Sequence, residues 1–214
     1  MTYPRTDSRY ITTDIVATIP ERLKAIAIGE YRATADALLK TKINGHKGFV
    51  DNSKVSDHHA IIPTEQKPNL ALLSSEERKI YDLVVKRFLS VMLPPFEYVQ
   101  TTIEANVEGE RLIAKGKVVK SKGWKKLYDH LEEDNSEDDI KEQVLPQVNK
   151  GDKVTLTKVE LKTGQTKPPA RFTEATLLSA MENPHKYINV GKEAAKTLGE
   201  TGGLGTVATR ADII

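Results

Sequence analysis

The sequence contains no cysteine, which excludes disulfide bonds and zinc sites with cysteine ligands. No apolar run approaches the ~18 residues that a membrane-spanning helix needs, and the first residues lack the charged-then-apolar layout of a signal peptide. Aromatic residues make up only 6% of the chain, and we expect the one tryptophan, Trp124, to be a packing residue rather than a base-stacking platform. These absences favour a cytoplasmic protein with no membrane partner.

Charge, by contrast, is abundant, since Asp, Glu, Lys and Arg make up 29% of the 214 residues and the net charge is +2. Residues 129–142 hold eight acidic residues and one lysine, a local balance of −7 that leaves +9 for the rest. We expect this acidic stretch to be a solvated, mobile loop. A basic body suits a polyanionic partner such as nucleic acid, although an ordinary polar protein also fits the composition.

Three regions with different periodicity predict an α+β fold. Residues 1–95 predict a helical domain, with one helix after Thr12 and Thr13 and another that starts near Pro20 and keeps helical spacing through residues 21–41. A Ser74–Glu77 capping box predicts a further helix that ends at the Pro94-Pro95 pair. The expected buried face of this last helix consists of Ile80, Leu83, Val84, Phe88 and Val91.

The middle region, residues 96–167, predicts antiparallel strands. Residues 99–107 alternate between apolar and polar, Glu108-Gly109 signals a turn, and residues 111–119 form the return strand, with one face buried. Residues 153–161 predict another strand, with a possible bulge near Lys158.

The last region, residues 168–214, predicts helices again. Thr173 can cap a helix that runs to about Glu182, with Leu177, Leu178 and Met181 facing inward. Glycines at 202, 203 and 205 then form a flexible turn before a final helical segment.

Three polar clusters are candidates for chemistry. The first surrounds Tyr3, a poor nucleophile at neutral pH unless a cation or base assists it. Pro4 keeps Tyr3 out of helical geometry, and Arg5 can donate two parallel hydrogen bonds to a phosphate. Taken alone, a cluster at this position is more typical of a frayed polar tail than of a site.

The second cluster is Asp57-His58-His59, which could move a proton or bind a phosphate oxygen, or could simply be an exposed loop. We expect no metal site, because adjacent residues rarely point at one ion. The third cluster, residues 203–210, combines a glycine-rich turn with Thr209 and Arg210 and offers donors to a phosphate, or forms an ordinary helical corner. It is not an ATP-binding P-loop, because the GxxxxGK[ST] pattern is absent from the chain.

In their order along the chain, these motifs resemble one family. TYPRTDSRY, SDHHAIIPT, PPARFTEATLLSAME and GLGTVATRADII together are similar to type IA DNA topoisomerases of the bacterial topoisomerase III branch. The resemblance implies an ATP-independent isomerase in which Tyr3 cleaves one DNA strand, remains joined to the 5′ phosphate, and allows strand passage and religation. Single-stranded and negatively supercoiled DNA are the implied partners, in the bacterial cytoplasm and at the nucleoid.

The resemblance also assigns roles to individual residues. Arg5 would stabilise the phosphoryl group in the transition state, and His58 would contact the scissile phosphate or assist a proton. Thr6 and Asp7 would support the loop, and the role of His59 stays open. Four residues are implied as DNA contacts: Thr209, Arg210, Arg171 and Arg9.

The family fold implies a tyrosine-bearing helical domain (1–95), part of a β arch that serves as a hinge (96–167) and part of a helical DNA-binding domain (168–214). Magnesium would belong to a Toprim domain upstream of Tyr3, with no metal ligands in this chain, so we expect a fragment that is inactive alone. The alternative is a non-catalytic nucleic-acid-binding module on the same scaffold. A relaxase is disfavoured by the lack of a histidine triad, and a tyrosine recombinase by the early position of Tyr3.

Overall fold

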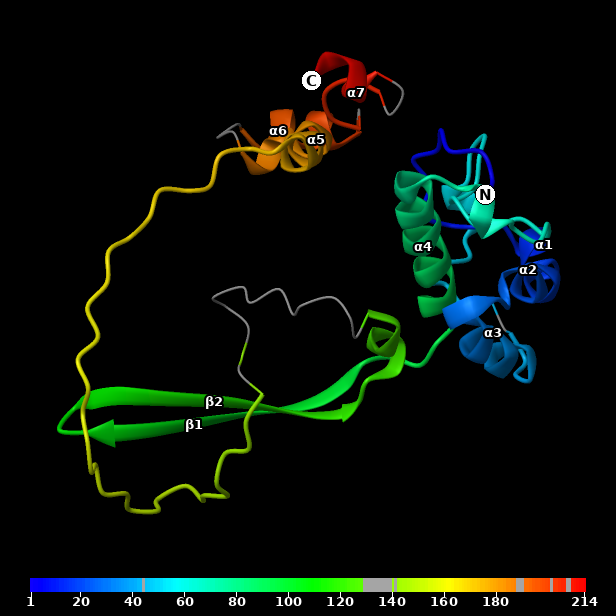
Figure 1. The fold of residues 1–214 in the computed structure, drawn as a ribbon. Helices are drawn as coiled ribbons and strands as arrows, with labels where there is room; N and C mark the ends of the chain where they lie inside the picture. Colours follow the sequence, from blue (N-terminus) through cyan, green and yellow to red (C-terminus); the bar gives the residue numbers. More distant parts are fainter. Residues whose placement is uncertain (44, 129–139, 141, 188–190, 201, 207–208) are drawn as a thin grey trace.

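A computed structural model describes residues 1–43, 45–128, 140, 142–187, 191–200, 202–206 and 209–214. These residues form an α+β protein with helices at both ends and one two-stranded antiparallel sheet between them (Figure 1). Most of the acidic stretch that we expected to be a mobile loop, residues 129–139 and 141, lies outside the described residues.

The first helices are short. α1 spans Thr13–Val16 and α2 spans Ile19–Ile26, with Pro20 in the first turn of α2 as predicted. The continuous helix expected over residues 21–41 is wrong, because the chain turns into the 3₁₀ helix η1 (Gly29–Tyr31) before α3 (Arg32–Leu39). Gly29 has a φ of 49°, a left-handed conformation that an α-helix cannot contain and that glycine adopts readily.

The long helix α4 spans Ser75–Ser90 and begins at the predicted capping box, in which Ser74 Oγ accepts from the Glu77 amide and the Glu77 carboxylate accepts from the Ser74 amide. Its predicted buried face is wrong in part, since Ile80 and Leu83 are 61% and 60% exposed. The helix has two apolar stripes, and the one that packs consists of Tyr81, Val85, Phe88 and Leu89.

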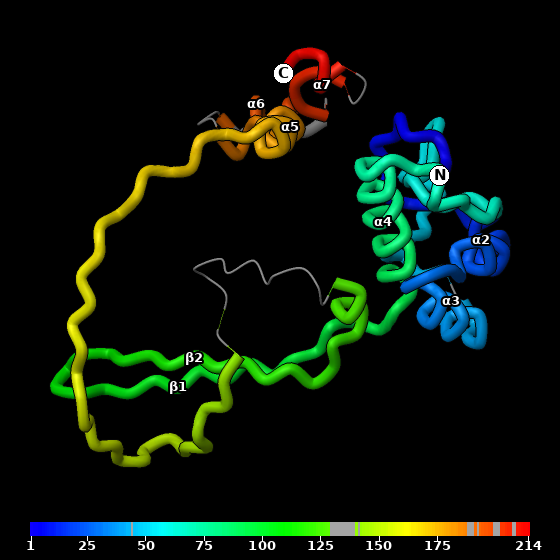
Figure 2. The backbone as a smooth tube through the Cα atoms, viewed as in Figure 1, coloured from blue at the N-terminus to red at the C-terminus, as the bar shows by residue number. Residues whose placement is uncertain are grey.

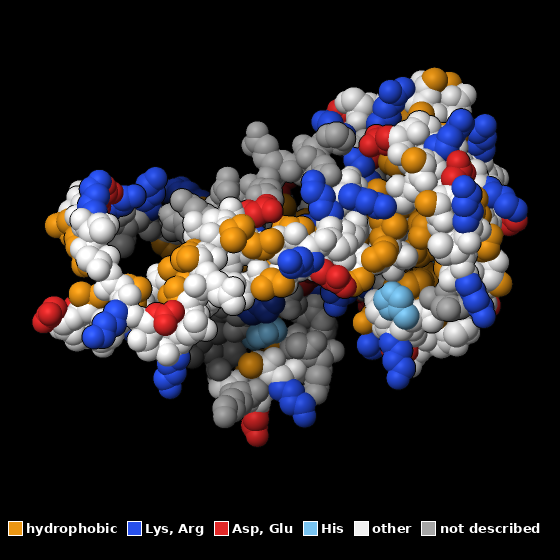
Figure 3. Space-filling model, turned by 90° about the horizontal axis from the view of Figure 1, so that it is seen from below, with side chains coloured by type: hydrophobic (Ala, Val, Ile, Leu, Met, Phe, Trp, Pro, Cys, Tyr) orange, Lys and Arg blue, Asp and Glu red, His pale blue; other side chains and the backbone are white. Residues whose placement is uncertain are grey.

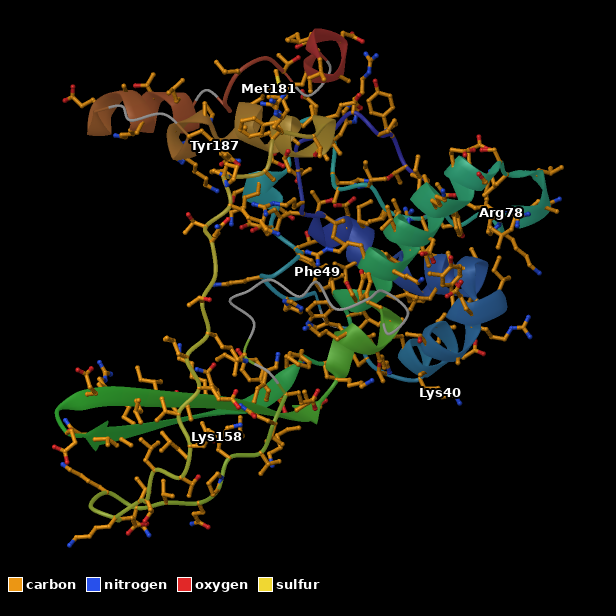
Figure 4. The ribbon with its side chains drawn as sticks, turned by 60° about the vertical axis from the view of Figure 1, so that its left-hand side comes forward. Lys40, Phe49, Arg78, Lys158, Met181 and Tyr187 are labelled. Carbon is orange, nitrogen blue, oxygen red and sulfur yellow. The ribbon has the colours of Figure 1, made fainter. Side chains whose placement is uncertain are left out.

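One hydrophobic core joins α2, α3 and α4 to the loops between them. Its loop members are Ile11, Phe49 and Ile62, which bring the segments before α1 and before α4 into the same core. Phe49 lies among these helices in Figure 4. Two further 3₁₀ helices, η2 (Asn52–Lys54) and η3 (Leu70–Leu72), shape the long connection. The residues around the first polar cluster therefore rest on a packed body.

The sheet is the predicted hairpin, formed by β1 (Glu97–Val107) and β2 (Glu110–Ser121). Glu108 and Gly109 both have positive φ, at 51° and 91°, as two-residue hairpin turns of the favoured twist require. The expectation that one face of this strand is buried is wrong, because the residues of β1 are exposed or at most half-buried. After β2, the 3₁₀ helix η4 (Gly123–Tyr128) packs against the end of α4, and the half-buried Trp124 donates its amide to the Pro94 carbonyl, in agreement with a packing role.

The strand predicted over residues 153–161 is absent from the structure. This segment belongs to a long extended connection, drawn in yellow in Figure 1, and its apolar side chains are exposed, Leu161 by 91%. Lys158 lies on this connection in Figure 4. The alternation alone could not make a strand, since a strand needs a hydrogen-bonded neighbour and none of the described residues provides one here.

The C-terminal helices are α5 (Glu174–Glu182), η5 (Pro184–Lys186), α6 (Lys192–Glu200) and α7 (Arg210–Ile213). Thr173 caps α5 as predicted, and Leu177, Leu178 and Met181 are half-buried or buried. Figures 1, 2 and 4 show these helices beside the N-terminal helical body, where the extended connection returns them. None of the helices among the described residues has the length and apolar character needed to span a membrane.

Candidate active site

The segment that carries Tyr3, residues 1–11, is held by residues far away in sequence. The amide of Thr2 donates to the Ile62 carbonyl at 2.9 Å, and the Ile62 amide donates to Thr2 Oγ1 at 3.0 Å. Further along, the Ala60 amide donates to the Tyr10 carbonyl at 2.8 Å. These bonds exclude a frayed tail, and they align residues 1–11, hereafter the tyrosine segment, with residues 58–62.

This alignment brings Tyr3 and His58 together. Their ring centres lie 4.5 Å apart with the planes tilted by 45°, and the Tyr3 side chain is 53% exposed. Thr6 Oγ1 donates to the His58 carbonyl at 3.0 Å and accepts from the Ser8 amide at 3.1 Å. Thr6 therefore fixes the backbone on which His58 stands, while the Tyr3 phenol stays accessible to a ligand.

A polar groove of about 1170 Å³ has His58, but not Tyr3, in its lining. The tyrosine segment contributes Arg5, Asp7 and Arg9 to one wall, beside His58, and the C-terminal helices contribute Lys186 to the other. The guanidinium groups of Arg5 and Arg9 make no hydrogen bond or ion pair within the part of the chain that the structure describes. Both are therefore available to an anionic ligand.

The opposite wall includes the glycine turn, defined here as residues 202–206. Its three glycines have positive φ, and a Cβ on Gly203 would lie 2.2 Å from the Met181 carbonyl oxygen. The Leu204 amide donates to that same carbonyl at 2.7 Å. The turn therefore packs directly on the end of α5, where Figure 4 shows Met181, and glycine at 203 is a steric requirement.

Arg210, which we expected to contact DNA, is only 6% exposed and binds the glycine turn. Its Nε donates to the Leu204 carbonyl at 3.0 Å, and its Nη2 donates to the Gly202 and Gly205 carbonyls. Nη1 lies 3.4 Å from Glu182. Arg210 lines the groove, but its guanidinium is already used to hold the turn against α5.

The other expected DNA contacts lie in different surroundings. Thr209 is exposed, and its Oγ1 accepts from the Thr206 amide at 3.0 Å. Arg171 is exposed on the connection before α5 and does not line the groove. His59 Nδ1 lies 2.7 Å from the Ala60 carbonyl, which directs it to its own backbone rather than to Tyr3.

Two residues near the site were missed from the sequence. Lys186, in η5, faces the groove because the distant C-terminal helices fold back onto the tyrosine segment, which no local pattern signals. Arg22 is buried, donates to the Pro63 carbonyl at 2.6 Å and lies 2.6 Å from the Glu65 carboxylate. Arg22 therefore ties residues 63–65, which follow His58 and His59, to α2. In the sequence, only its position among the apolar residues of a predicted helix could have drawn attention to it.

On the face shown in Figure 3, the basic side chains of the described residues do not gather into a single patch. Lys and Arg are distributed there over the helical body and the hairpin, with acidic groups among them.

In the core, burial raises the pKa of Tyr81 to about 12. Among the described residues, no group of three or more His, Cys, Asp or Glu side chains could hold a metal ion.

An exposed phenol beside an imidazole, with unpaired guanidinium groups in an adjoining groove, suits an enzyme that attacks a phosphodiester. A family model described as DNA topoisomerase matches residues 1–214, and the chain belongs to this family. This confirms the family predicted from the motifs.

Several similar curated proteins, all from Bacillus species, are named DNA topoisomerase 3. The chain is 59% identical to that of Bacillus thuringiensis (strain Al Hakam) and 54% identical to that of Bacillus subtilis (strain 168), each over 216 aligned residues. The match covers all of this chain and 30% of each relative, so the chain spans less than a third of their length. The Bacillus licheniformis protein is 53% identical over 215 residues.

Proposed function

We propose that this chain carries the strand-cleaving tyrosine of a bacterial type IA topoisomerase. Tyr3 Oη attacks the phosphorus of one DNA strand, the bond to the 3′ oxygen breaks, and the phenolic proton ends on the released 3′ hydroxyl. The strand is then joined to Tyr3 through its 5′ phosphate, and the reverse reaction reseals it. The observation that carries this proposal is the contact between the Tyr3 and His58 rings at 4.5 Å, beside the groove.

The surrounding residues support the same reaction. Arg5, which lines the groove with His58, would stabilise the charged phosphoryl group, and His58 would contact the phosphate or assist the proton, with Thr6 and Asp7 as supporting residues. Single-stranded and negatively supercoiled DNA would be the substrates, at the nucleoid in the cytoplasm. Because the bond energy is kept in the phosphotyrosine, the cycle needs no ATP.

The described residues contain no group of three or more His, Cys, Asp or Glu side chains that could hold magnesium, so the metal is assigned to none of them. We propose that the chain acts within a protein of the relatives' length, in which a Toprim domain binds the metal. In that arrangement, residues 1–95 are the tyrosine domain, residues 96–167 part of the hinge arch, and residues 168–214 part of the DNA-binding domain. The change from helices to hairpin and back supports this division.

The test is Tyr3→Phe in a protein of that length. We expect loss of both the covalent DNA adduct and relaxation, with single-strand binding retained, because only the nucleophile is removed. Tyr98→Phe is the matched control, since Tyr98 is similarly exposed (48%) but lies on the hairpin. Relaxation that survives Tyr3→Phe would contradict the proposal and favour a non-catalytic nucleic-acid-binding module.

A further inference from the structure

A second polar depression, of about 360 Å³, adjoins the groove that contains Tyr3's partner His58. Three residues line both: Asp7, Arg9 and Ser56. The two depressions are therefore neighbours, with Arg9 between them. The far end of the second depression is formed by the residues around η2, chiefly Lys54 and Ser53, and by Tyr10.

Lys54 is held in place at this far end. Its Nζ donates to Tyr10 Oη at 3.2 Å and lies 4.5 Å from the centre of the Tyr10 ring. Its backbone carbonyl accepts from Ser8 Oγ at 2.8 Å, which ties η2 to the tyrosine segment. The hydrogen bond to Tyr10 raises the pKa of Lys54, so the ammonium remains charged at neutral pH.

The existing partners of Lys54 leave it able to bind an anion. The Asp51 carboxylate is 3.5 Å away, and the Lys54 side chain is 53% exposed, so this ion pair contributes little. Asp51 is also occupied by Ser53, whose amide and hydroxyl both donate to it. Arg9, at the other end of the depression, has no partner among the described residues.

We propose that Arg9 and Lys54 form a second phosphate subsite, which binds a phosphodiester of the same single DNA strand next to the linkage held at Tyr3 and Arg5. The proposal rests on the proposed function. Two cations, the held Lys54 and the unpaired Arg9, at the two ends of a depression beside the groove match a backbone that carries one negative charge per nucleotide. The subsite sets the direction in which the strand leaves the active site.

The first test measures binding of a labelled single-stranded oligonucleotide, over a range of salt concentrations, to the protein carrying Tyr3→Phe. Lys54→Gln should weaken binding roughly threefold to tenfold at low salt and reduce the slope of log K against log salt by about 0.7, the value for one lost phosphate contact. Lys54→Arg should retain the slope. Lys40→Gln is the control, because Lys40 is exposed at the end of α3 and lines neither depression.

The second test identifies the phosphate. A series of oligonucleotides, each with one neutral methylphosphonate linkage at a different position, is prepared. The affinity of each is measured for the Tyr3→Phe protein with Lys54 and for the same protein with Lys54→Gln. At one position, the neutral linkage should weaken binding to the protein with Lys54 and should have no effect on binding to the Lys54→Gln protein. An unchanged salt slope, or methylphosphonate effects that are equal in the two proteins, would overturn the subsite while Tyr3-dependent cleavage stands. Failure of the protein with Lys54 to bind single strands at all would overturn the proposed function as well.

Discussion

The two loops that face each other across the groove use their arginines in opposite ways. The tyrosine segment is fixed by backbone hydrogen bonds to residues 58–62, and its Arg5 and Arg9 remain unpaired within the described residues. The glycine turn is fixed by the side chain of Arg210, which donates to three of its carbonyls. An arginine in a polar motif can therefore serve either the ligand or the fold, and only the structure distinguishes the two.

The difference follows from backbone geometry. An extended segment pairs with a neighbour through its own amides and carbonyls and leaves its side chains free. A turn built of left-handed glycines points several carbonyls to one side, where no backbone donor is available, and a buried guanidinium with five donors can satisfy them. Arg5 and Arg210 should therefore respond differently to the same substitution.

The largest expected effect is that of Arg210→Met. Removing the buried guanidinium takes away the donor to three carbonyls of the turn, and it should cost roughly 3 kcal/mol of local stability. Hydrogen exchange of the α5 amides checks this, because exchange there should accelerate. Arg5→Met is the matched control, with unchanged exchange and a loss of covalent DNA adduct. Equal effects of the two substitutions on α5 would contradict the comparison.

Features of the fold that depend on residues close together in sequence could be predicted, and features that depend on distant residues could not. The capping box at Ser74, the helix cap at Thr173 and the turn at Glu108-Gly109 were predicted correctly, because each is decided within four residues. The strand over residues 153–161 and the exposed stripe of α4 were predicted wrongly, because burial and strand pairing depend on partners elsewhere in the chain.

The same distinction applies to the site. Tyr3, Arg5 and His58 were grouped from the order of the motifs, but their approach depends on hydrogen bonds between segments more than fifty residues apart, such as that from Thr6 to the His58 carbonyl. Lys186 was missed because it reaches the groove only after a long connection returns the C-terminal helices. The burial of Arg210 could not be predicted from a motif in which arginine suits a phosphate equally well.

Gly203→Ala should have the next largest effect. The alanine would have to adopt a φ of 91° and place its Cβ 2.2 Å from the Met181 carbonyl oxygen, so the turn must move. We expect a loss of about 1–3 kcal/mol. Gly164→Ala is the control, since Gly164 has open space around it and no positive φ. Limited proteolysis near residue 203 measures the change, and equal cleavage of both variants would show that the turn is not constrained by α5.

The smallest effect is expected for Thr6→Val in the tyrosine segment. The substitution keeps the side-chain shape but removes the hydrogen bonds to the His58 carbonyl and the Ser8 amide, at a cost of about 1 kcal/mol. Because the backbone bonds of Thr2 and Tyr10 remain, the segment should stay ordered, and covalent adduct formation should fall only severalfold through a less well fixed His58. Thr102→Val, on the exposed face of β1, should change neither stability nor adduct. If Thr6→Val instead destabilised the segment as strongly as Arg210→Met destabilises the glycine turn, the tyrosine segment would also depend on a side chain, and the contrast between the two loops would be wrong.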